Sequence, residues 1–356
     1  MTQLSDAAWD SLLAMFKDLA EVVRADARDD RERLEGYRVL TRVMALCSEL
    51  SLDVDPDVPR FLPMTTPMRH IAGPNPDGAY DLCAITAGRS YRITGSRETV
   101  TYLGFQVMAG TGLTPRRQAA YVSDTDLTLD EEGRFGFVLA TSDPGTGEHW
   151  VEIPEDASAV VVRQYISDRA TERVATYDIE QLEPAGPVAE LTDATLADQL
   201  GAFMWTAFKL MTLHRTVLPE LLTETNTLVT AEAASLGSEN TTPDNLYMLG
   251  MFDLDPGQAL VMDIEPPDCR YWSITLESIW HECLDPFRTR SSGTQAGFTP
   301  RPDGTVRVVI AADDPGVPNW LATGGRGRGY VVLRWLDNPA APRVALAVAP
   351  LQEVSA

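Results

Sequence analysis

Two stretches of this sequence repeat each other at a constant distance, and this repeat constrains the fold more than any other feature. Residues 132–145, EGRFGFVLATSDPG, align without a gap over residues 303–316, DGTVRVVIAADDPG, at an offset of 171. A tryptophan follows each Asp-Pro-Gly turn, and Arg163 in VVVRQY then meets Arg334 in VVLRWL at the same offset. A shared turn, strand pattern, tryptophan and arginine in the same order predict that one β-rich module occurs twice.

A second repeated phrase extends the repeat toward the start of each module. Residues 72–80, AGPNPDGAY, and residues 240–247, NTTPDNLY, both contain Pro-Asp-x-x-Tyr and both precede a hydrophobic run. With small gaps, Tyr102 also matches Tyr271. Most of the repeated residues suit a scaffold, because Asp-Pro-Gly is a strong turn and the two arginines lie inside strands, where each can pair with a carboxylate.

Helical patterns precede both modules. Apolar residues follow helical spacing over residues 5–27 and 30–50, and again after a cap at Thr192 and Asp193, whereas short β-branched and aromatic runs fill the remainder. We therefore predict an α+β fold with two internally duplicated β-sandwich-like units, each preceded by a helical segment. The predicted ranges are 1–69 for helices and a proline-rich connector, 70–190 for the first β unit, 191–238 for linking helices and 239–356 for the second β unit.

Composition narrows the partners. The formal net charge is −23 and the pI is near 4.5, so the surface repels phosphate backbones and anionic lipids, and nucleic acid and membrane partners are not expected. The start of the chain lacks a basic and apolar leader, and the four cysteines form no C-x-x-C pair, which together favour a cytoplasmic protein with reduced thiols. We expect a small-molecule ligand, and association with further copies stays open.

The second module resembles a known family. The run YWSITLES, followed by DGTVRVVIAADDPGVPNWLATGGRGRGYVVLRWL, resembles the C-terminal unit of the paired domains of unknown function numbered 1254 and 1214. Asn319, Trp320 and Leu321 match that family's Asn-Trp-Leu signature, and the N-terminal NPDGAYDLCAI is similar to the phrase that opens the other unit. The turn in LATGGRGRGY departs from the family pattern. The resemblance implies two β-sandwich-like units joined by helices and implies no activity.

Cofactor and metal motifs are missing from the sequence. The four histidines show no metal-ligand spacing, and there is neither a dinucleotide-binding glycine fingerprint nor a G-x-S-x-G elbow, so we expect no metal and no cofactor. Cys283 could be a nucleophile or an inert buried thiol. Arg326 and Arg328, in GGRGRGY, lie in a flexible β-connection or meet an anionic ligand.

The stretch WHECLDPFR is the best candidate for catalysis. It places an imidazole, two carboxylates and a guanidinium directly after an alternating strand, in His281, Glu282, Asp285 and Arg288. We predict that His281 is a general acid or base oriented by Glu282 or Asp285, and that Arg288 binds an anionic group. His149, beside a tryptophan, is the other plausible imidazole. The alternative is a polar loop whose charged residues form salt bridges.

The two Pro-Asp-x-x-Tyr phrases supply the predicted ligand contacts. Asp77 and Tyr80 from the first phrase, and Asn245 and Tyr247 from the second, are expected to line a cleft between the β units. Their alternative role is local, since Asn and Asp before a strand often form Asx-turns.

Two classes of function follow, and the sequence does not choose between them. The first is a cofactor-independent hydrolase or lyase that uses acid–base chemistry on a small polar or amphipathic molecule. The second is a non-catalytic ligand-binding or assembly protein. Convergence of His281 with other polar groups in one place would favour the enzyme.

Overall fold

The chain groups into two compact units in the computed structural model. The structure describes residues 3–52, 54–110, 116–184, 186, 190–232, 236, 241–285, 288–337 and 342–354. Unit 1 comprises Met1–Arg69, Ala79–Gln164 and Arg173–Leu213, and unit 2 comprises His70–Gly78, Tyr165–Glu172 and His214–Ala356. Two short segments that the sequence ranges assign to the first β unit, 70–78 and 165–172, thus group with unit 2, because their hydrogen bonds go there.

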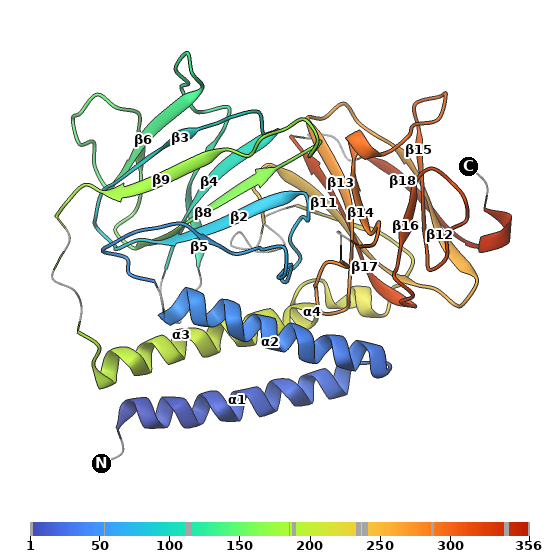
Figure 1. Cartoon of the computed structure of the whole chain (residues 1–356), viewed down its shortest axis with the longest axis horizontal. Coiled ribbons are helices and arrows are strands. Elements are labelled where there is room, and N and C mark those ends of the chain that lie inside the picture. The colour runs from blue at the N-terminus through green and yellow to red at the C-terminus, as the bar shows by residue number, and fades with distance from the viewer. Residues whose placement is uncertain are drawn as a thin grey trace. The chain divides into compact units, whose positions relative to one another are not determined.

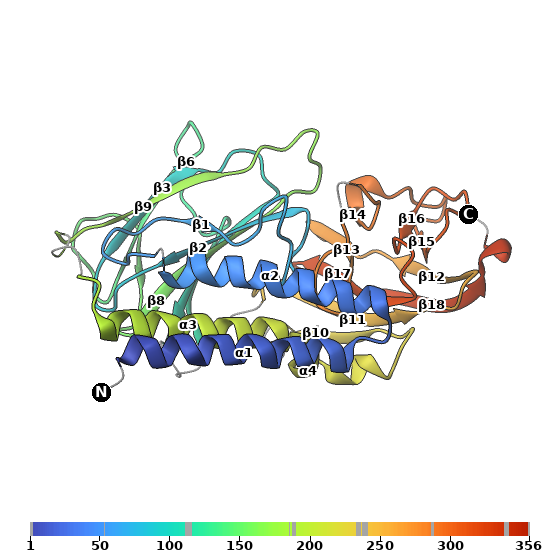
Figure 2. The ribbon, with the colours of Figure 1, turned by 60° about the horizontal axis from the view of Figure 1, so that its bottom comes forward.

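Three long helices belong to unit 1. They are α1 (Leu4–Asp26), α2 (Asp30–Leu52) and α3 (Asp193–Met211), close to the predicted ranges. The Thr192 hydroxyl accepts a hydrogen bond from the Thr195 amide, so a capping box begins α3. The helices lie side by side in Figures 1 and 2. Phe16 of α1 meets Phe203 of α3 edge to face. No helix in the described part of the chain is long and apolar enough to cross a membrane.

Unit 1 contains a five-stranded and a four-stranded sheet (Figure 1). In spatial order the first consists of β1 (Leu62–Pro63), β2 (Gly78–Ala84), β8 (Ala157–Tyr165), β4 (Tyr102–Ala109) and β5 (Arg117–Ser123). The second consists of β7 (Trp150–Glu152), β6 (Arg134–Ala140), β3 (Tyr91–Ser96) and β9 (Thr176–Gln181). Phe105 of β4 packs on Phe137 of β6, so the two sheets face each other across a core.

Unit 2 repeats this arrangement. Its five-stranded sheet consists of β10 (Val229–Glu232), β11 (Asn245–Asp253), β17 (Arg328–Leu336), β13 (Tyr271–Glu277) and β14 (Ser292–Thr294). Its four-stranded sheet consists of β16 (Trp320–Ala322), β15 (Val306–Ala311), β12 (Gln258–Glu265) and β18 (Arg343–Pro350). Short helices in the described part of the chain are α4 (Leu213–Thr216), η1 (Pro219–Leu222), η3 (Gln295–Gly297) and η4 (Leu351–Glu353). Strand β10 lies within the range predicted as linking helices.

The strand orders confirm the predicted fold class and the duplication. The order β1-β2-β8-β4-β5 in unit 1 corresponds strand for strand to β10-β11-β17-β13-β14 in unit 2, and β7-β6-β3-β9 corresponds to β16-β15-β12-β18. Both units also contain one parallel pair, β6 with β7 and β15 with β16, whereas the other described strand pairs are antiparallel.

The repeated tryptophans perform the same task in both units. The indole nitrogen of Trp150 donates to the carbonyl of Ala140 at 3.1 Å, and that of Trp320 donates to the carbonyl of Ala311 at 3.1 Å. Both fasten the short parallel strand to its neighbour. The repeated turns also agree. The amide of Gly145, whose φ is 68°, donates to the side chain of Asp143, and the amide of Gly316 donates to the side chain of Asp314.

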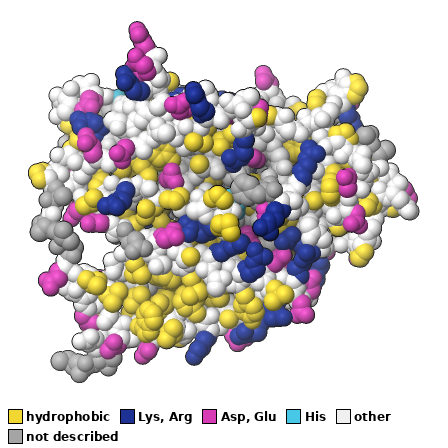
Figure 3. All heavy atoms as spheres, viewed as in Figure 1, with side chains coloured by type: hydrophobic (Ala, Val, Ile, Leu, Met, Phe, Trp, Pro, Cys, Tyr) yellow, Lys and Arg dark blue, Asp and Glu magenta, His cyan; other side chains and the backbone are white. Residues whose placement is uncertain are grey.

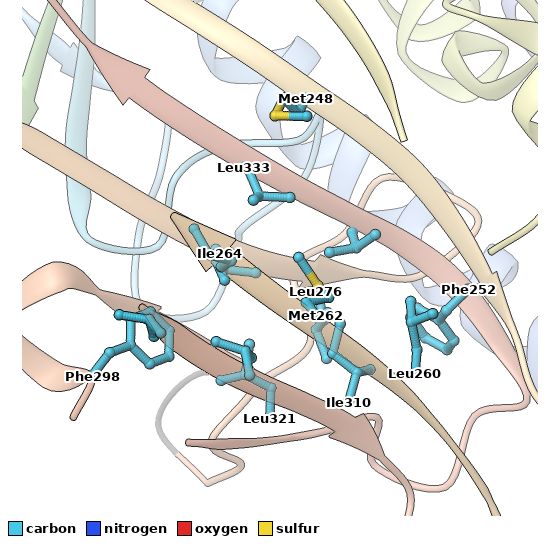
Figure 4. Packing of buried hydrophobic residues seen from close by; sticks show 14 of the residues in the cluster. Met248, Phe252, Leu260, Met262, Ile264, Leu276, Phe298, Ile310, Leu321 and Leu333 are labelled. Atoms are coloured by element: carbon cyan, nitrogen blue, oxygen red, sulfur yellow. The ribbon is translucent and has the colours of Figure 1, made fainter. Parts of the chain in front are cut away.

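The core of unit 2 lies between its two sheets, as Figure 4 shows for fourteen of its side chains. Strand β13 explains how the core forms. Trp272, Ile274 and Leu276 alternate along it and point into the core, while the residues between them lie on the other, outer face of the sheet. The outer face of this sheet is therefore the surface that core packing does not occupy.

The outer faces of the two five-stranded sheets differ in chemistry. In unit 1 this face carries an apolar cluster that includes Met108 and Ala159, and it packs against Leu50 of α2. The repeat places Met108 at the position of Glu277 and Ala159 at the position of Tyr330. Two positions of this face are thus apolar in unit 1 and polar in unit 2, although Arg163 and Gln106 make part of the face in unit 1 polar as well.

The protein surface is mixed on the face that Figure 3 shows. Acidic and basic side chains alternate over it, and hydrophobic side chains gather over the helices. Trp9 and Leu13 of α1, with Trp205 and Phe208 of α3, are exposed.

The equivalence of the two tryptophans can be tested by substitution. Trp150→Phe and Trp320→Phe each remove one N–H donor and keep an aromatic ring. Each bonded carbonyl retains a second donor, the amide of Ile153 or of Thr323. We therefore expect both to lower the free energy of unfolding by a similar, small amount, about 0.5–1.5 kcal/mol. Calorimetry on both variants measures this, and a loss confined to one unit would contradict the shared role.

Candidate functional site

The polar outer face of unit 2 is formed by three neighbouring strands. Antiparallel pairing places Tyr247 of β11 opposite Arg334 of β17, and Glu277 of β13 opposite Tyr330 of β17. Because side chains alternate along a strand, these residues share one face. The polar side chains on this face are Asn245, Tyr247, Tyr271, Ser273, Thr275, Glu277, Tyr330 and Arg334, and all are buried.

A tight turn directly after β13 carries the predicted catalytic histidine. Glu277 forms an isolated antiparallel bridge with Cys283, and the amide of His281 donates to the carbonyl of Ser278 at 3.0 Å. The turn holds His281 at φ 54°, in the left-handed region that residues with a Cβ avoid. Such strain costs about 1–3 kcal/mol and is concentrated at functional sites.

His281 and Glu277 form a buried dyad. The ring Nδ1 of His281 lies 3.0 Å from Oε2 of Glu277, and the two side chains are 7% and 1% exposed. The imidazole stacks on the ring of Tyr330, with centroids 4.2 Å apart and planes 16° apart. A carboxylate accepts hydrogen bonds, so Nδ1 carries the proton and the lone pair is on Nε2. The dyad therefore fixes both the orientation and the tautomer of the ring.

Arg334 links the dyad to its surroundings. Its Nη2 lies 3.8 Å from Oε1 of Glu277 and donates to the carbonyl of Gly73 at 2.7 Å. Its Nη1 donates to the hydroxyl of Thr275 at 3.1 Å, and its guanidinium lies 6.0 Å from the ring centre of Tyr247. This confirms that the repeated arginine of the second module faces a carboxylate, whereas Arg163 of unit 1 binds the amide of Gln106.

Five polar atoms, on this face and on His281, have no hydrogen-bond partner in the described part of the chain. Three of them meet at the dyad, namely Nε2 of His281, Oε1 of Glu277 and the hydroxyl of Tyr330, and the others are Oδ1 of Asn245 and Oγ of Ser273. Burial, and then the charge of Glu277, raises the pKa of the Tyr330 phenol, so this group is a neutral donor. Each buried polar group without a partner costs about 1–3 kcal/mol, so their concentration around one imidazole calls for an explanation.

Residues 70–78, which we name the strap, pass over the dyad. The amide of Gly73 donates to the carbonyl of His281 at 2.8 Å, and the amide of Cys283 donates to the carbonyl of His70 at 2.9 Å. The thiol of Cys283 donates to the carbonyl of Pro74 at 3.1 Å. Burial raises the pKa of Cys283 well above the usual range, so this group is a neutral thiol and not a thiolate nucleophile.

The remaining predicted catalytic residues lie outside the dyad. Glu282 is buried, and its main-chain carbonyl accepts from the amide of Ser278 at 2.8 Å. Asp285 and Arg288 are exposed and face each other at 3.6 Å. Glu277, four residues before His281, is thus the carboxylate that contacts the imidazole Nδ1, a position for which the sequence suggested Glu282 or Asp285.

The predicted ligand contacts fall in both units. Asn245 donates to the hydroxyl of Tyr247 at 3.2 Å, beside Arg334. The amide of Asp77 donates to the side chain of Asn75 at 3.1 Å, which is the Asx-turn that the sequence allowed. Tyr80 lies in β2 and belongs to unit 1. The ligand role of these residues, and the cleft between the β units, stay predictions.

Glu277 and Tyr330 were not predicted as site residues, although the alternation of polar and apolar residues around Glu277 points to that position. In YWSITLE the residues Tyr271, Ser273, Thr275 and Glu277 alternate with Trp272, Ile274 and Leu276. This alternation predicts a strand with one polar face. A carboxylate is rarely buried, so Glu277 at the end of the strand would stand out if that polar face were buried. Among the described residues, no group of three His, Cys, Asp or Glu side chains could hold a metal ion.

A comparison with known protein families matches a segment of unit 2. Residues 253–340 match the family described as Protein of unknown function (DUF1214). The predicted resemblance is thereby confirmed for this segment of unit 2, which holds His281 and Glu277; the 1254-like part stays a prediction. No curated protein matches the chain significantly.

Two solved structures resemble the chain over nearly its full length. An uncharacterised protein from Burkholderia cenocepacia has a TM-score of 0.91 at 27% sequence identity, with 99% of this chain and 99% of that chain covered. The VPA0106 protein from Vibrio parahaemolyticus has a TM-score of 0.50 at 13% identity, with 93% of this chain and 99% of that chain covered. The second likeness shows the fold alone. The DUF1214 match and these neighbours leave the activity to be argued from the site.

Substitution of two tyrosines distinguishes the groups without a partner from those with one. Tyr330→Phe removes a buried hydroxyl that bonds nothing described, so we expect the free energy of unfolding to be unchanged or to rise by about 1 kcal/mol. Tyr271→Phe is the matched control, because its hydroxyl accepts from Asn75 at 2.6 Å, and it should lose about 1–3 kcal/mol. Thermal unfolding of both variants tests the contrast; a clear loss in Tyr330→Phe would show that its hydroxyl is satisfied in the folded protein.

Proposed function

We propose that unit 2 binds a small polar molecule at the His281–Glu277 dyad and transfers a proton with Nε2 of His281, as a cofactor-independent hydrolase or lyase. The observation that carries the proposal is the pairing of Nδ1 with a buried carboxylate while Nε2 has no partner among the described residues. An imidazole held in this way is a typical general base, because its carboxylate partner stabilises the imidazolium that forms.

The surroundings support proton transfer over simple binding. Glu277 and His281 lie where water is excluded, and electrostatic interactions are strongest in such places. The neutral phenol of Tyr330 supplies a donor beside the base. A base and a donor held together can remove a proton from a substrate and stabilise the oxyanion that develops.

The atoms without partners indicate the ligand chemistry. Oε1 of Glu277 and Nε2 of His281 accept hydrogen bonds, and the hydroxyl of Tyr330 donates one. A ligand that satisfies all three carries two donor hydrogens, from two hydroxyls or one amine, next to a carbonyl or hydroxyl acceptor. Arg334 balances the charge of Glu277, which favours a ligand without a large net charge.

The alternative is a non-catalytic binding protein that uses the same groups. The depth of the dyad favours this second candidate, because Glu277 is only 1% exposed and a substrate must enter and leave during every turnover. The two candidates differ in what the carboxylate does: a binder needs a hydrogen-bond acceptor, whereas a general base needs the charge.

Replacement of the imidazole tests the site. Asn tolerates the left-handed region, so His281→Asn should preserve the turn while it removes the base. We expect wild-type protein to be stabilised by hydroxyl- or amine-bearing carbonyl compounds in a thermal-shift screen, and His281→Asn to lose that response. His149→Asn is the control, since His149 is exposed in unit 1 and occupies the repeat position of Asn319. Equal responses in wild type and His281→Asn would refute the site.

Replacement of the carboxylate separates the two classes. Glu277→Gln keeps the shape and an acceptor oxygen but removes the charge that stabilises the imidazolium. For an enzyme, turnover of a substrate found in the screen should fall about 10²–10⁴-fold while binding persists. Measurement of turnover and affinity on the same ligand decides: equal turnover in the variant would exclude general-base catalysis by this dyad.

A further inference from the structure

We infer that the strap is a gate, which closes over the His281–Glu277 dyad and opens to admit a ligand. This inference deepens the proposed function and rests on it, because it assigns regulation of access to the same site. The strap lies between two segments of unit 1 in the sequence, yet it groups by its contacts with unit 2.

The strap is what covers the carboxylate. A Cβ built on Gly73 would lie 3.4 Å from Oε2 and 3.5 Å from Oε1 of Glu277, so the main chain of the strap rests against this group. The atoms of the dyad that have no partner are also shielded from solvent. A ligand that contacts Glu277 therefore has to displace residues 72–74.

Hydrogen bonds hold the strap in place without a strand ladder. Its backbone is irregular from residue 70 to residue 77, and Pro74 and Pro76 have no amide hydrogen to donate. Besides its contacts with the turn at His281 and Cys283, the strap is held by the latch, Arg334, which donates to the carbonyl of Gly73 at 2.7 Å, and by Arg169, which donates to the carbonyl of Pro76 at 2.7 Å. Irregular segments open at a lower free energy than the sheets that surround them.

The middle of the strap is strained when closed, and its end is anchored. Ala72 and Gly73 both adopt positive φ, 68° and 65°, and the Cβ of Ala72 disfavours that conformation. Beyond them, Asn75 donates to the hydroxyl of Tyr271 at 2.6 Å, and the amide of Ile166 donates to the carbonyl of Asp77 at 2.9 Å. The strap thus has a strained moving part and a fixed hinge.

Cys283 provides a reporter for opening that requires no ligand. Its thiol is buried and donates to the carbonyl of Pro74, so it becomes accessible when the strap lifts. Cys47 and Cys83 are buried in unit 1 and report on unfolding of that unit, and the half-buried Cys269 serves as the accessible reference. Maleimide labelling of the native full-length protein, with mass spectrometry of each cysteine-containing peptide, measures the four rates separately.

The expected order of rates is Cys269 first, then Cys283, with Cys47 and Cys83 slowest. Arg334→Lys loses the geometry of the latch and should accelerate labelling of Cys283 about tenfold. Ala72→Gly relieves the strain of the closed form and should slow it about fivefold. Arg163→Lys, the equivalent substitution in unit 1, is the matched control and should leave the rate of Cys283 unchanged.

Two results would overturn the gate. One is labelling of Cys283 no faster than Cys47 and Cys83, which means that it is exposed only when the protein unfolds. The other is a rate of Cys283 that Arg334→Lys and Ala72→Gly do not change. Neither result depends on the chemistry of His281, so the gate can fail while the ligand response of wild type and its loss in His281→Asn stand. Conversely, selective labelling of Cys283 without any such ligand response would keep the gate and refute the proposed function.

Discussion

The buried ion pair between Arg334 and Glu277 is the interaction on which the polar face of unit 2 depends. A carboxylate that is 1% exposed would carry a desolvation penalty of several kcal/mol if it stood alone. Arg334, at 3.8 Å, and His281, at 3.0 Å, offset that penalty, and the other contacts of Arg334 hold the strap and the hydroxyl of Thr275 in place. Loss of the guanidinium would leave a buried charge, so the sheet, the strap and the dyad are coupled through one side chain.

Duplication provides an internal comparison for this arrangement. The two five-stranded sheets have the same strand order, and the repeated arginine occupies the same strand position in both. In unit 1 its partner is Gln106, and Met108 and Ala159 replace the carboxylate and the phenol. The five-stranded sheet of unit 1 therefore forms without a carboxylate or a phenol at these two positions.

The architecture could be predicted from the sequence because the repeated residues have strong local structural roles. The same contacts are made in both units by Asp143, Gly145 and Trp150 and by their counterparts in unit 2. Their spacing in the sequence therefore predicted the duplicated fold.

The site was harder to predict. Residue type and the place after a strand point to His281, but they suggest Glu282 or Asp285 as its partner. The contact is made by Glu277 instead, because the turn after β13 brings Cys283 opposite Glu277 and the imidazole beside it. The sequence predicts a ligand role for Asp77, but no local pattern indicates that residues 70–78 as a whole group with the second unit.

Several features of the site raise the free energy of the closed state. His281 and Ala72 occupy the left-handed region, and three polar atoms around the dyad have no described partner. Each of these raises the free energy of the closed, ligand-free form, and each would be relieved by strap movement or by a bound polar group. The positions of unit 1 that correspond to Glu277 and Tyr330 are the apolar residues Met108 and Ala159. Natural sequences break local rules mainly at functional sites, and here several such violations lie around one imidazole.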